Sequence, residues 1–203
     1  MARGLERTSE RDGMDKVDSD YKDLFVYDMD VLTKLAIKYG TDKWGKHHYT
    51  PYYYNLYRNK SKRRNVRKVL EIGVGEGAGL RTFRDFFPNA VIYGAEIADD
   101  RIFEEDRIKV YKCDQSKAVD LIRLLQKTGR DIDLVVEDGS HKPFDQVVTC
   151  LEILPDLERG TTYVIEDVAD IRVFKEIKKY YSQAELVRLG KRYDDQLVII
   201  KKI

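Results

Sequence analysis

An α/β fold with a doubly wound, mostly parallel sheet is predicted by three observations. Apolar stretches of strand length alternate with amphipathic stretches of helical length from residue 68 onwards. The first apolar stretch breaks into a glycine-spaced turn that leads into a helix, Gly73-Val-Gly-Glu-Gly77. The last two apolar stretches have a link too short for a parallel crossover. The chain is therefore expected to end in an antiparallel hairpin on the edge of a seven-stranded sheet.

Three regions are expected along the chain. Residues 1–27 are polar and lack periodicity, which is typical of a flexible or partner-ordered arm. Residues 28–66 are expected to form a helical leader or lid, and residues 67–203 the ligand-binding domain. The predicted elements are helix 28–39, a helical segment at 50–59, strand 68–72, helix 78–87, strands 91–95 and 107–112, helix 116–128, strand 132–136, helix 143–154, strand 161–165, helix 171–181, and strands 185–189 and 196–201.

The composition is that of one globular domain. The 203 residues, 42% of them hydrophobic, suffice for a single core. Lys and Arg number 37 against 36 Asp and Glu, and the resulting net charge of +1 gives the whole molecule no general attraction for nucleic acid or membranes. An apolar run of about 18 residues, as a membrane span needs, is absent from the sequence, and so is an apolar N-terminal region of the secretory type. Cys113 and Cys150 lack metal-type spacing, so we expect reduced thiols and a cytoplasmic protein.

The glycine turn predicts a nucleotide-type ligand site. Gly73, Gly75 and Gly77 allow a sharp turn, and the amides of the following helix start have no partner inside the helix. A purely structural turn is the alternative interpretation. Glu71 lies two residues before the first glycine, and no P-loop lysine follows. An acid here repels a pyrophosphate but accepts from an ammonium group, such as that of S-adenosylmethionine (SAM).

Further acids follow the other predicted strands, at the edge where doubly wound folds bind ligands. Glu96 is positioned to accept from two ribose hydroxyls, or else to be a solvated loop acid. Asp114 and Gln115 are expected either to bind the adenine edge or to close a loop locally.

Three acids and a histidine form a second group at the same edge. Asp138, Glu166 and Asp167 follow two predicted strands, and converging carboxylates repel one another unless a cation joins them. Mg²⁺ prefers such oxygen ligands. His141 is a candidate proton acceptor, because a histidine takes up protons near neutral pH. Helix capping by the acids and a surface role for His141 are the alternatives.

These motifs together resemble a known family, the Mg²⁺-dependent and SAM-dependent sugar O-methyltransferases of macrolide biosynthesis (mycinamicin and demethylmacrocin type), which share motifs with the cephalosporin hydroxylase-like group. The resemblance runs from about residue 34 to 201. The matching segments are Lys38-Tyr-Gly-Thr-Asp-Lys43, Leu70-Glu-Ile-Gly-Val-Gly75, Phe87-Pro-Asn-Ala-Val-Ile-Tyr-Gly-Ala-Glu-Ile97, Asp114-Gln115, Glu137-Asp-Gly-Ser-His141 and Tyr163-Val-Ile-Glu-Asp167.

The resemblance implies a Rossmann-like class I methyltransferase that moves a methyl group from SAM to a hydroxyl of a sugar or glycan. It implies that Asp138, Glu166 and Asp167 bind Mg²⁺ and that His141 is the base. It also implies donor binding by a set of residues that includes the leader motif: Thr41, Lys43, Glu71, Gly73, Gly75, Gly79, Glu96, Asp114 and Gln115. The sequence departs from the family at Glu137, where the motif has Asp, and in its compact glycine motif.

Several alternatives stay open. The same metal-binding acids and base suit a catechol-type or phenol-type O-methyltransferase. A non-catalytic SAM-binding protein would keep the glycine turn. The basic segment 58–68 is interpreted either as a solvated linker or as a site for an anionic substrate or RNA. The tyrosine-rich segment 49–57 is expected to stack on sugar faces or to pack in the core or in a homo-oligomeric interface. Nucleic acid and membranes are not expected as partners.

Overall fold

The computed structural model describes residues 29–190 and 192–203 as one three-layer α/β unit. The predicted arm at 1–27 lies outside the described residues. The strands are β1 (Lys68–Ile72), β2 (Val91–Glu96), β3 (Glu104–Glu105), β4 (Ile108–Lys112), β5 (Leu134–Glu137), β6 (Thr162–Ile165), β7 (Glu185–Arg188) and β8 (Gln196–Lys201). The helices are α2 (Val31–Tyr39), α3 (Thr50–Tyr57), α4 (Lys60–Asn65), α5 (Ala78–Phe86), α6 (Ala118–Thr128), α7 (Pro143–Ile153) and α8 (Ile171–Tyr180).

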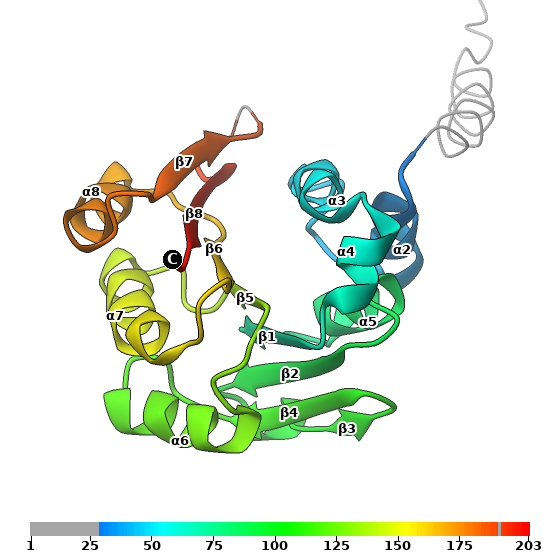
Figure 1. Cartoon of the computed structure of the whole chain (residues 1–203), viewed down its shortest axis with the longest axis horizontal. Coiled ribbons are helices and arrows are strands. Elements are labelled where there is room, and N and C mark those ends of the chain that lie inside the picture. The colour runs from blue at the N-terminus through cyan, green and yellow to red at the C-terminus, as the bar shows by residue number, and fades with distance from the viewer. Residues whose placement is uncertain (1–28, 191) are drawn as a thin grey trace, which may run out of the picture.

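The strands form one mixed sheet in the order β3-β4-β2-β1-β5-β6-β8-β7 (Figure 1). Strands β4, β2, β1, β5 and β6 are parallel neighbours, whereas β8 runs antiparallel to both β6 and β7. The predicted parallel sheet with an antiparallel terminal hairpin is confirmed. The sheet has eight strands rather than seven, because the two residues of β3 pair with the start of β4.

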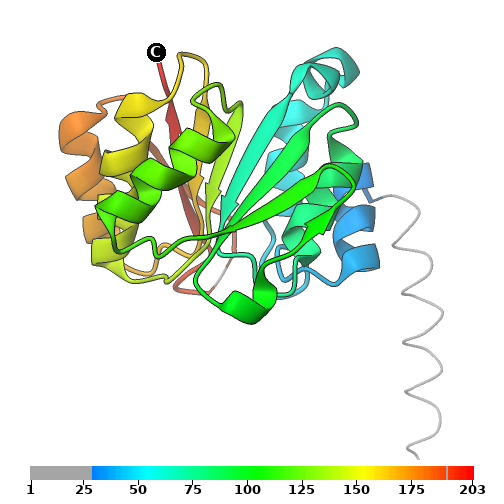
Figure 2. The ribbon, with the colours of Figure 1, turned by 90° about the horizontal axis from the view of Figure 1, so that it is seen from below.

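Helices cover both faces of the sheet, as the view along its edge shows (Figure 2). On one face α6, α7 and α8 bury side chains such as Leu124, Ile153 and Ile177. On the other face α2, α3 and α5 bury Leu32, Tyr53 and Phe83. The predicted strands are therefore apolar on both sides, and the polar side chains gather at the strand ends.

Local chemistry fixes where the leader helices begin and end. Asp30 caps α2 by accepting from the amide of Thr33 at 2.9 Å, and Gly40 ends it in the left-handed region at φ 72°. Within the basic segment 58–68, which we interpreted as a linker or an anion site, residues 60–65 form α4, capped by the side chain of Asn59. Helix α2 packs on both α3 and α5, which brings residues 41–49 over the carboxyl edge of the sheet.

Candidate functional site

The glycine turn between β1 and α5 lies directly against the loop that follows β5. A Cβ on Gly73 would lie 2.1 Å from the backbone oxygen of Asp138, so only glycine fits there, and its φ of +88° is also left-handed. A Cβ on Gly79 would lie 2.4 Å from the carboxylate of Glu71. Gly75 is in the same left-handed region, at φ 53°. The turn therefore joins the two groups of residues that the sequence predicted separately.

Glu96 at the end of β2 holds this turn in place. Its carboxylate accepts from four backbone amides, those of Val74 and Gly75 in the turn and of Ile97 and Ala98 after β2, at 2.8–3.2 Å. Burial works against ionisation, but these amides keep the pKa of Glu96 below its ordinary value. Glu96 is thus an ionised acid facing the predicted nucleoside site.

Asp114 and Gln115 differ in their surroundings. Asp114 accepts from the hydroxyl and the amide of Ser116 and pairs with Lys117, and these contacts lower its pKa to about 2. Gln115 is buried and donates to Glu137 at 2.8 Å, while its carbonyl accepts from the amide of Ser140 at 2.7 Å. The Gln115 side chain therefore ties the loop after β4 to the loop after β5.

Lys43 of the leader motif lies at the centre of the site. Its ammonium is 3.0 Å from Glu71, 2.7 Å from Asp138 and 2.6 Å from Glu166, with the lysine side chain only 3% exposed. Burial opposes the charge of Lys43, yet the three carboxylates raise its pKa well above the ordinary value. One cation thus connects the predicted donor acid with two of the predicted metal ligands.

Asp138, His141 and Asp167 form a group able to hold a metal ion, with one ligand atom of each within 4.8 Å of the others. His141 Nδ1 lies 3.9 Å from Asp138 and 3.8 Å from Asp167. Both His141 and Asp167 have left-handed backbone conformations, with φ of 55° and 52°, which is uncommon outside glycine and frequent at functional sites. The two carboxylates of this group fit a divalent cation that prefers oxygen ligands, and the His141 ring lies beside them.

Glu166 is next to this group but has other partners. Its carboxylate accepts from Lys43 at 2.6 Å and from the Tyr53 hydroxyl at 2.6 Å. Burial and the charge of Asp138 raise the pKa of Glu166 well above its ordinary value, and the same two causes raise that of Asp167. The carboxylates of Glu71, Asp138 and Glu166 thus share the ammonium of Lys43, and further positive charge would stabilise this group of acids.

Three functional residues were missed as individual candidates. The His47 ring stacks on Tyr49 with 4.9 Å between centroids, and its Nδ1 shares a hydrogen bond of 2.7 Å with the Asp195 carboxylate. Its buried Nε2 has no hydrogen-bond partner in the described residues and lies 3.5 Å from Asp167. Tyr49 donates to Asp167 at 2.6 Å. Asp195 is on the terminal hairpin, far from the motifs, so a single sequence carried no signal for this contact.

A cavity of about 790 Å³ contains most of the predicted site. All nine predicted donor-binding residues line it, together with Asp138 and His141. Glu166 and Asp167 are not among its lining residues, since they lie deeper, beneath the leader segment. The structure therefore brings the predicted donor residues into one cavity, with the metal-capable group at its wall.

Comparison with known proteins defines the class. The chain matches no protein-family model. The crystal structure of the MycE methyltransferase from the mycinamycin biosynthetic pathway, in complex with Mg and SAH, has a TM-score of 0.69 and 28% identity over 84% of this chain and 54% of that one. The crystal structure of a putative caffeoyl-CoA O-methyltransferase from Staphylococcus aureus shares the fold at a TM-score of 0.59 and 14% identity. The fold is that of class I methyltransferases.

Within that class, sequence comparison finds homologues over about two thirds of this chain. An 8-demethyl-8-alpha-L-rhamnosyl tetracenomycin-C 2'-O-methyltransferase of Streptomyces olivaceus is 35% identical over 70% of this chain. The mycinamicin VI 2''-O-methyltransferase of Micromonospora griseorubida is 36% identical over 68%. The homologues of this chain are therefore sugar O-methyltransferases. The chain spans just over a third of their length, 38% and 36% respectively.

Proposed function

We propose that this protein is a SAM-dependent, Mg²⁺-assisted O-methyltransferase that acts on a hydroxyl of a sugar or glycan. One observation carries the proposal: Asp138 belongs to the metal-capable group and also lines the cavity that holds the predicted donor residues. A methyl donor in the cavity and an acceptor oxygen at the acids would then lie next to each other, as direct transfer requires. The family relationship of the chain supports the same reaction.

The donor half uses residues that already face the cavity. Glu71 is expected to accept from the ammonium group of SAM, and Glu96 from its ribose hydroxyls, with Asp114 and Gln115 near the adenine end. Gly73 and Gly75 let the turn approach the ligand closely. Thr41 and Lys43 close the cavity from the leader segment. SAM supplies an activated methyl group on a sulfonium, so the protein has only to hold and align it.

In the acceptor half, Asp138, Glu166 and Asp167 are the residues expected to hold Mg²⁺, and His141 is the expected base. Bound Mg²⁺ supplies a Lewis acid that lowers the pKa of the acceptor hydroxyl. The exposed ring of His141, 45% accessible, can take the hydroxyl proton as the acceptor oxygen forms its bond to the methyl carbon. The carbon–sulfur bond breaks with its electron pair passing to sulfur, which gives a methyl ether and S-adenosylhomocysteine.

The test combines binding with turnover. Isothermal titration of the whole chain with SAM and with Mg²⁺ is expected to show both binding, and a panel of sugars, glycosides and catechols should show methyl transfer to a sugar hydroxyl. Asp138→Asn is expected to lower kcat/KM by roughly 1000-fold, since several kcal/mol of charge stabilisation depend on the metal. The exposed Asp131→Asn is the matched control.

Two outcomes would contradict parts of the proposal. Full activity in excess chelator would exclude the metal role, and preferred transfer to catechols would replace the sugar by an aromatic diol. SAM binding without turnover of any acceptor would favour a non-catalytic protein.

The remaining expectations concern the setting of the enzyme. We propose that it works in the cytoplasm, as a homo-oligomer, and without nucleic acid or a membrane as partner. Both cysteines are buried free thiols, which suits a reducing compartment. Among the described residues no helix has the length and apolar character to cross a membrane. A salt-sensitive shift of RNA mobility would instead favour an RNA substrate.

A further inference from the structure

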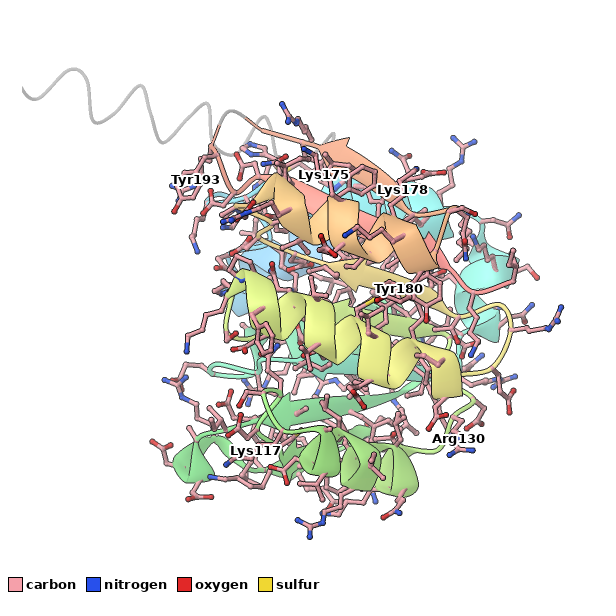
Figure 3. The ribbon with its side chains drawn as sticks, turned by 90° about the vertical axis from the view of Figure 1, so that its left-hand side faces the viewer. Lys117, Arg130, Lys175, Lys178, Tyr180 and Tyr193 are labelled. Atoms are coloured by element: carbon pink, nitrogen blue, oxygen red, sulfur yellow. The ribbon has the colours of Figure 1, made fainter. Side chains whose placement is uncertain are left out.

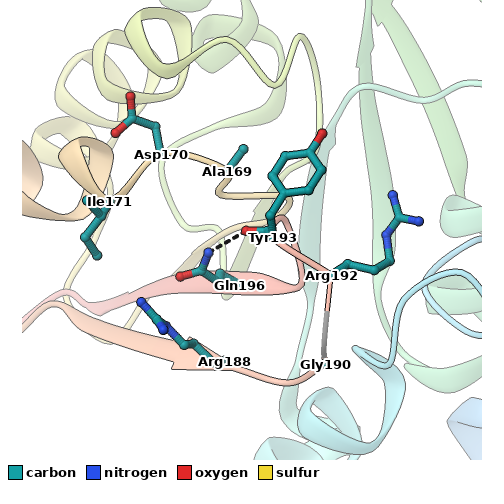
Figure 4. A pocket seen from close by; sticks show the side chains of 8 residues that line it. All are labelled: Ala169, Asp170, Ile171, Arg188, Gly190, Arg192, Tyr193 and Gln196. Atoms are coloured by element: carbon teal, nitrogen blue, oxygen red, sulfur yellow. Dashed lines mark hydrogen bonds between the residues drawn. The ribbon is translucent and has the colours of Figure 1, made fainter.

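A second cleft, of about 610 Å³, lies at the terminal hairpin (Figure 4). It is lined by Ala169, Asp170, Ile171, Arg188, Gly190, Arg192, Tyr193 and Gln196. Its volume falls within the roughly 300–1,000 Å³ of small-molecule sites. Nothing in the donor and metal halves described above uses these side chains.

The sheet topology puts this cleft beside the metal-capable group. Because β8 is antiparallel to both β6 and β7, the end of β7 and the start of β8 lie at the edge where β6 ends in Glu166 and Asp167. Along that edge the donor cavity lies over β4, β2, β1 and β5, the metal-capable group over β5 and β6, and the cleft over β6, β8 and β7. The cleft and the donor cavity thus lie on opposite sides of the metal-capable group.

Direct contacts join the wall of the cleft to the residues around Asp167. The amide of Val168 donates to the backbone oxygen of Gln196 at 3.1 Å, and the Tyr49 hydroxyl, which bonds Asp167, also lies 3.0 Å from the backbone oxygen of Asp194. The chain passes from Asp167 into the cleft wall within two residues, at Ala169. The wall of the cleft is therefore continuous with the part of the chain that carries Asp167, one of the predicted metal ligands.

The lining side chains have unmet capacity for a hydroxyl-rich ligand. Gln196 Oε1 is a buried acceptor without a hydrogen-bond partner in the described part of the chain. Arg188, on the same side of the hairpin in Figure 4, has no ion pair or hydrogen bond of its guanidinium to any described residue, whereas Arg192 extends to the other side and pairs with Asp194 at 3.1 Å. Asp170 is already neutralised by Arg172. Tyr193 offers an aromatic face that is 72% exposed.

We propose that this cleft binds a second sugar unit of the acceptor, next to the unit that is methylated. The Tyr193 ring packs on the C–H face of that sugar, and Arg188 donates to its hydroxyls. Gln196 Nε2 donates to the backbone oxygen of Tyr193 at 2.6 Å and holds the turn that carries the ring. This inference rests on the proposed sugar O-methyltransferase function. It narrows the substrate class from any sugar hydroxyl to a disaccharide or longer glycan.

The experiment compares matched acceptors of one and two units. The probes are methyl α-D-glucoside against maltose, methyl β-D-glucoside against cellobiose, and methyl α-L-rhamnoside against a rhamnose disaccharide. For at least one pair we expect the disaccharide to have a kcat/KM at least about tenfold higher, equivalent to roughly 1.4 kcal/mol. The double variant Tyr193→Ala/Arg188→Gln is expected to bring that ratio close to one. A ratio near one in the unmodified protein, or an unchanged ratio in the double variant, would overturn the proposal.

The control variant is Tyr180→Ala/Arg130→Gln. Tyr180 is 67% exposed, and Figure 3 shows both control residues on the surface away from Tyr193. The control is expected to keep the full ratio. If no acceptor is methylated, saturation-transfer NMR separates the two proposals. A disaccharide that binds the unmodified protein but not the double variant supports the cleft while the methyl-transfer function fails, and absence of disaccharide binding overturns the cleft itself.

Discussion

The two halves of the candidate site are built in different ways. The donor half is formed mainly by backbone: a glycine turn, a helix start, and Glu96, which accepts from four amides of two loops. The acceptor half is formed by side chains from distant segments. Lys43, His47, Tyr49 and Tyr53 come down from the leader segment onto carboxylates at the ends of β5 and β6.

This difference indicates which half depends on its neighbours. Amide donors stay in place whenever β1 and β2 are folded, so the arrangement of the donor half does not depend on other segments. The acids of the acceptor half repel one another, and burial and the charge of Asp138 raise the pKa of Glu166 and of Asp167. Their arrangement depends on the leader segment. Changes in that segment are therefore expected to affect the acceptor half more than the donor half.

Lys43→Met should have the largest effect on stability. It removes the only ammonium among Glu71, Asp138 and Glu166 while nearly conserving volume. We expect the free energy of unfolding to fall by about 3–5 kcal/mol, because buried carboxylates lose their partner. Urea denaturation measures this loss, and Lys46→Met is the control, since Lys46 is 48% exposed and pairs only with exposed Asp42.

Metal binding sharpens the same comparison. Mg²⁺ or Mn²⁺ is expected to stabilise Lys43→Met more than the unmodified protein, since a divalent cation can replace part of the lost positive charge. Equal stabilisation of both proteins would mean that Lys43 and the metal do not share an electrostatic environment.

Most of the donor half could be predicted from the sequence, because its signal is local. The strand β1 and the glycine turn are contiguous, and the acid Glu96 ends the next strand. All nine predicted donor residues line one cavity. What the sequence left open was the detailed role of Gln115. Its carbonyl and amide bond Ser140 and Glu137, and these contacts form only when the loops after β4 and β5 meet.

The acceptor half was predictable only in part. Strand ends predicted that Asp138, His141, Glu166 and Asp167 would share one edge, and they do. No sequence pattern indicated that Lys43 bonds Glu166, or that Asp195 on the terminal hairpin bonds His47 from 148 residues away. Such contacts depend on how α2 and α3 pack against α5, and no periodicity or motif encodes that geometry.

His47→Gln should have the next largest effect, on metal affinity rather than stability. The His47 ring lies between two acids. Its Nδ1 is 2.7 Å from the Asp195 carboxylate, and its Nε2 is 3.5 Å from the Asp167 carboxylate. Loss of a residue that orients a metal ligand typically weakens metal binding by roughly 10–100-fold. Titration with Mn²⁺ followed by electron paramagnetic resonance measures the change, and SAM affinity is expected to stay the same.

The neighbouring exposed His48 provides the control for this prediction. His48→Gln is expected to leave Mn²⁺ affinity unaltered. If both variants bind Mn²⁺ as the unmodified protein does, Asp167 does not depend on the leader segment, and the contrast between the two halves is weaker than proposed.

Glu71→Gln should have the smallest effect, and it tests the donor half. Burial, followed by the charge of Asp138, raises the pKa of Glu71 from 4.5 to about 7, although Lys43 opposes this. The folded protein therefore binds this proton more tightly than the unfolded chain, and its stability falls as the pH rises from about 4.5 to about 7. Glutamine does not titrate. In metal-free buffer at pH 8, the variant should thus be more stable, by at most about 3 kcal/mol.

Urea denaturation at pH 5 and pH 8 measures this difference, and the exposed Glu152→Gln is expected to show none. SAM affinity should fall at the same time, because glutamine lacks the charge that pairs with an ammonium group. Higher stability with weaker donor binding would indicate that Glu71 is retained for the ligand at a cost to the fold. A variant that is less stable at pH 8 would instead show that the ion pair with Lys43, at 3.0 Å, outweighs the burial of both charges.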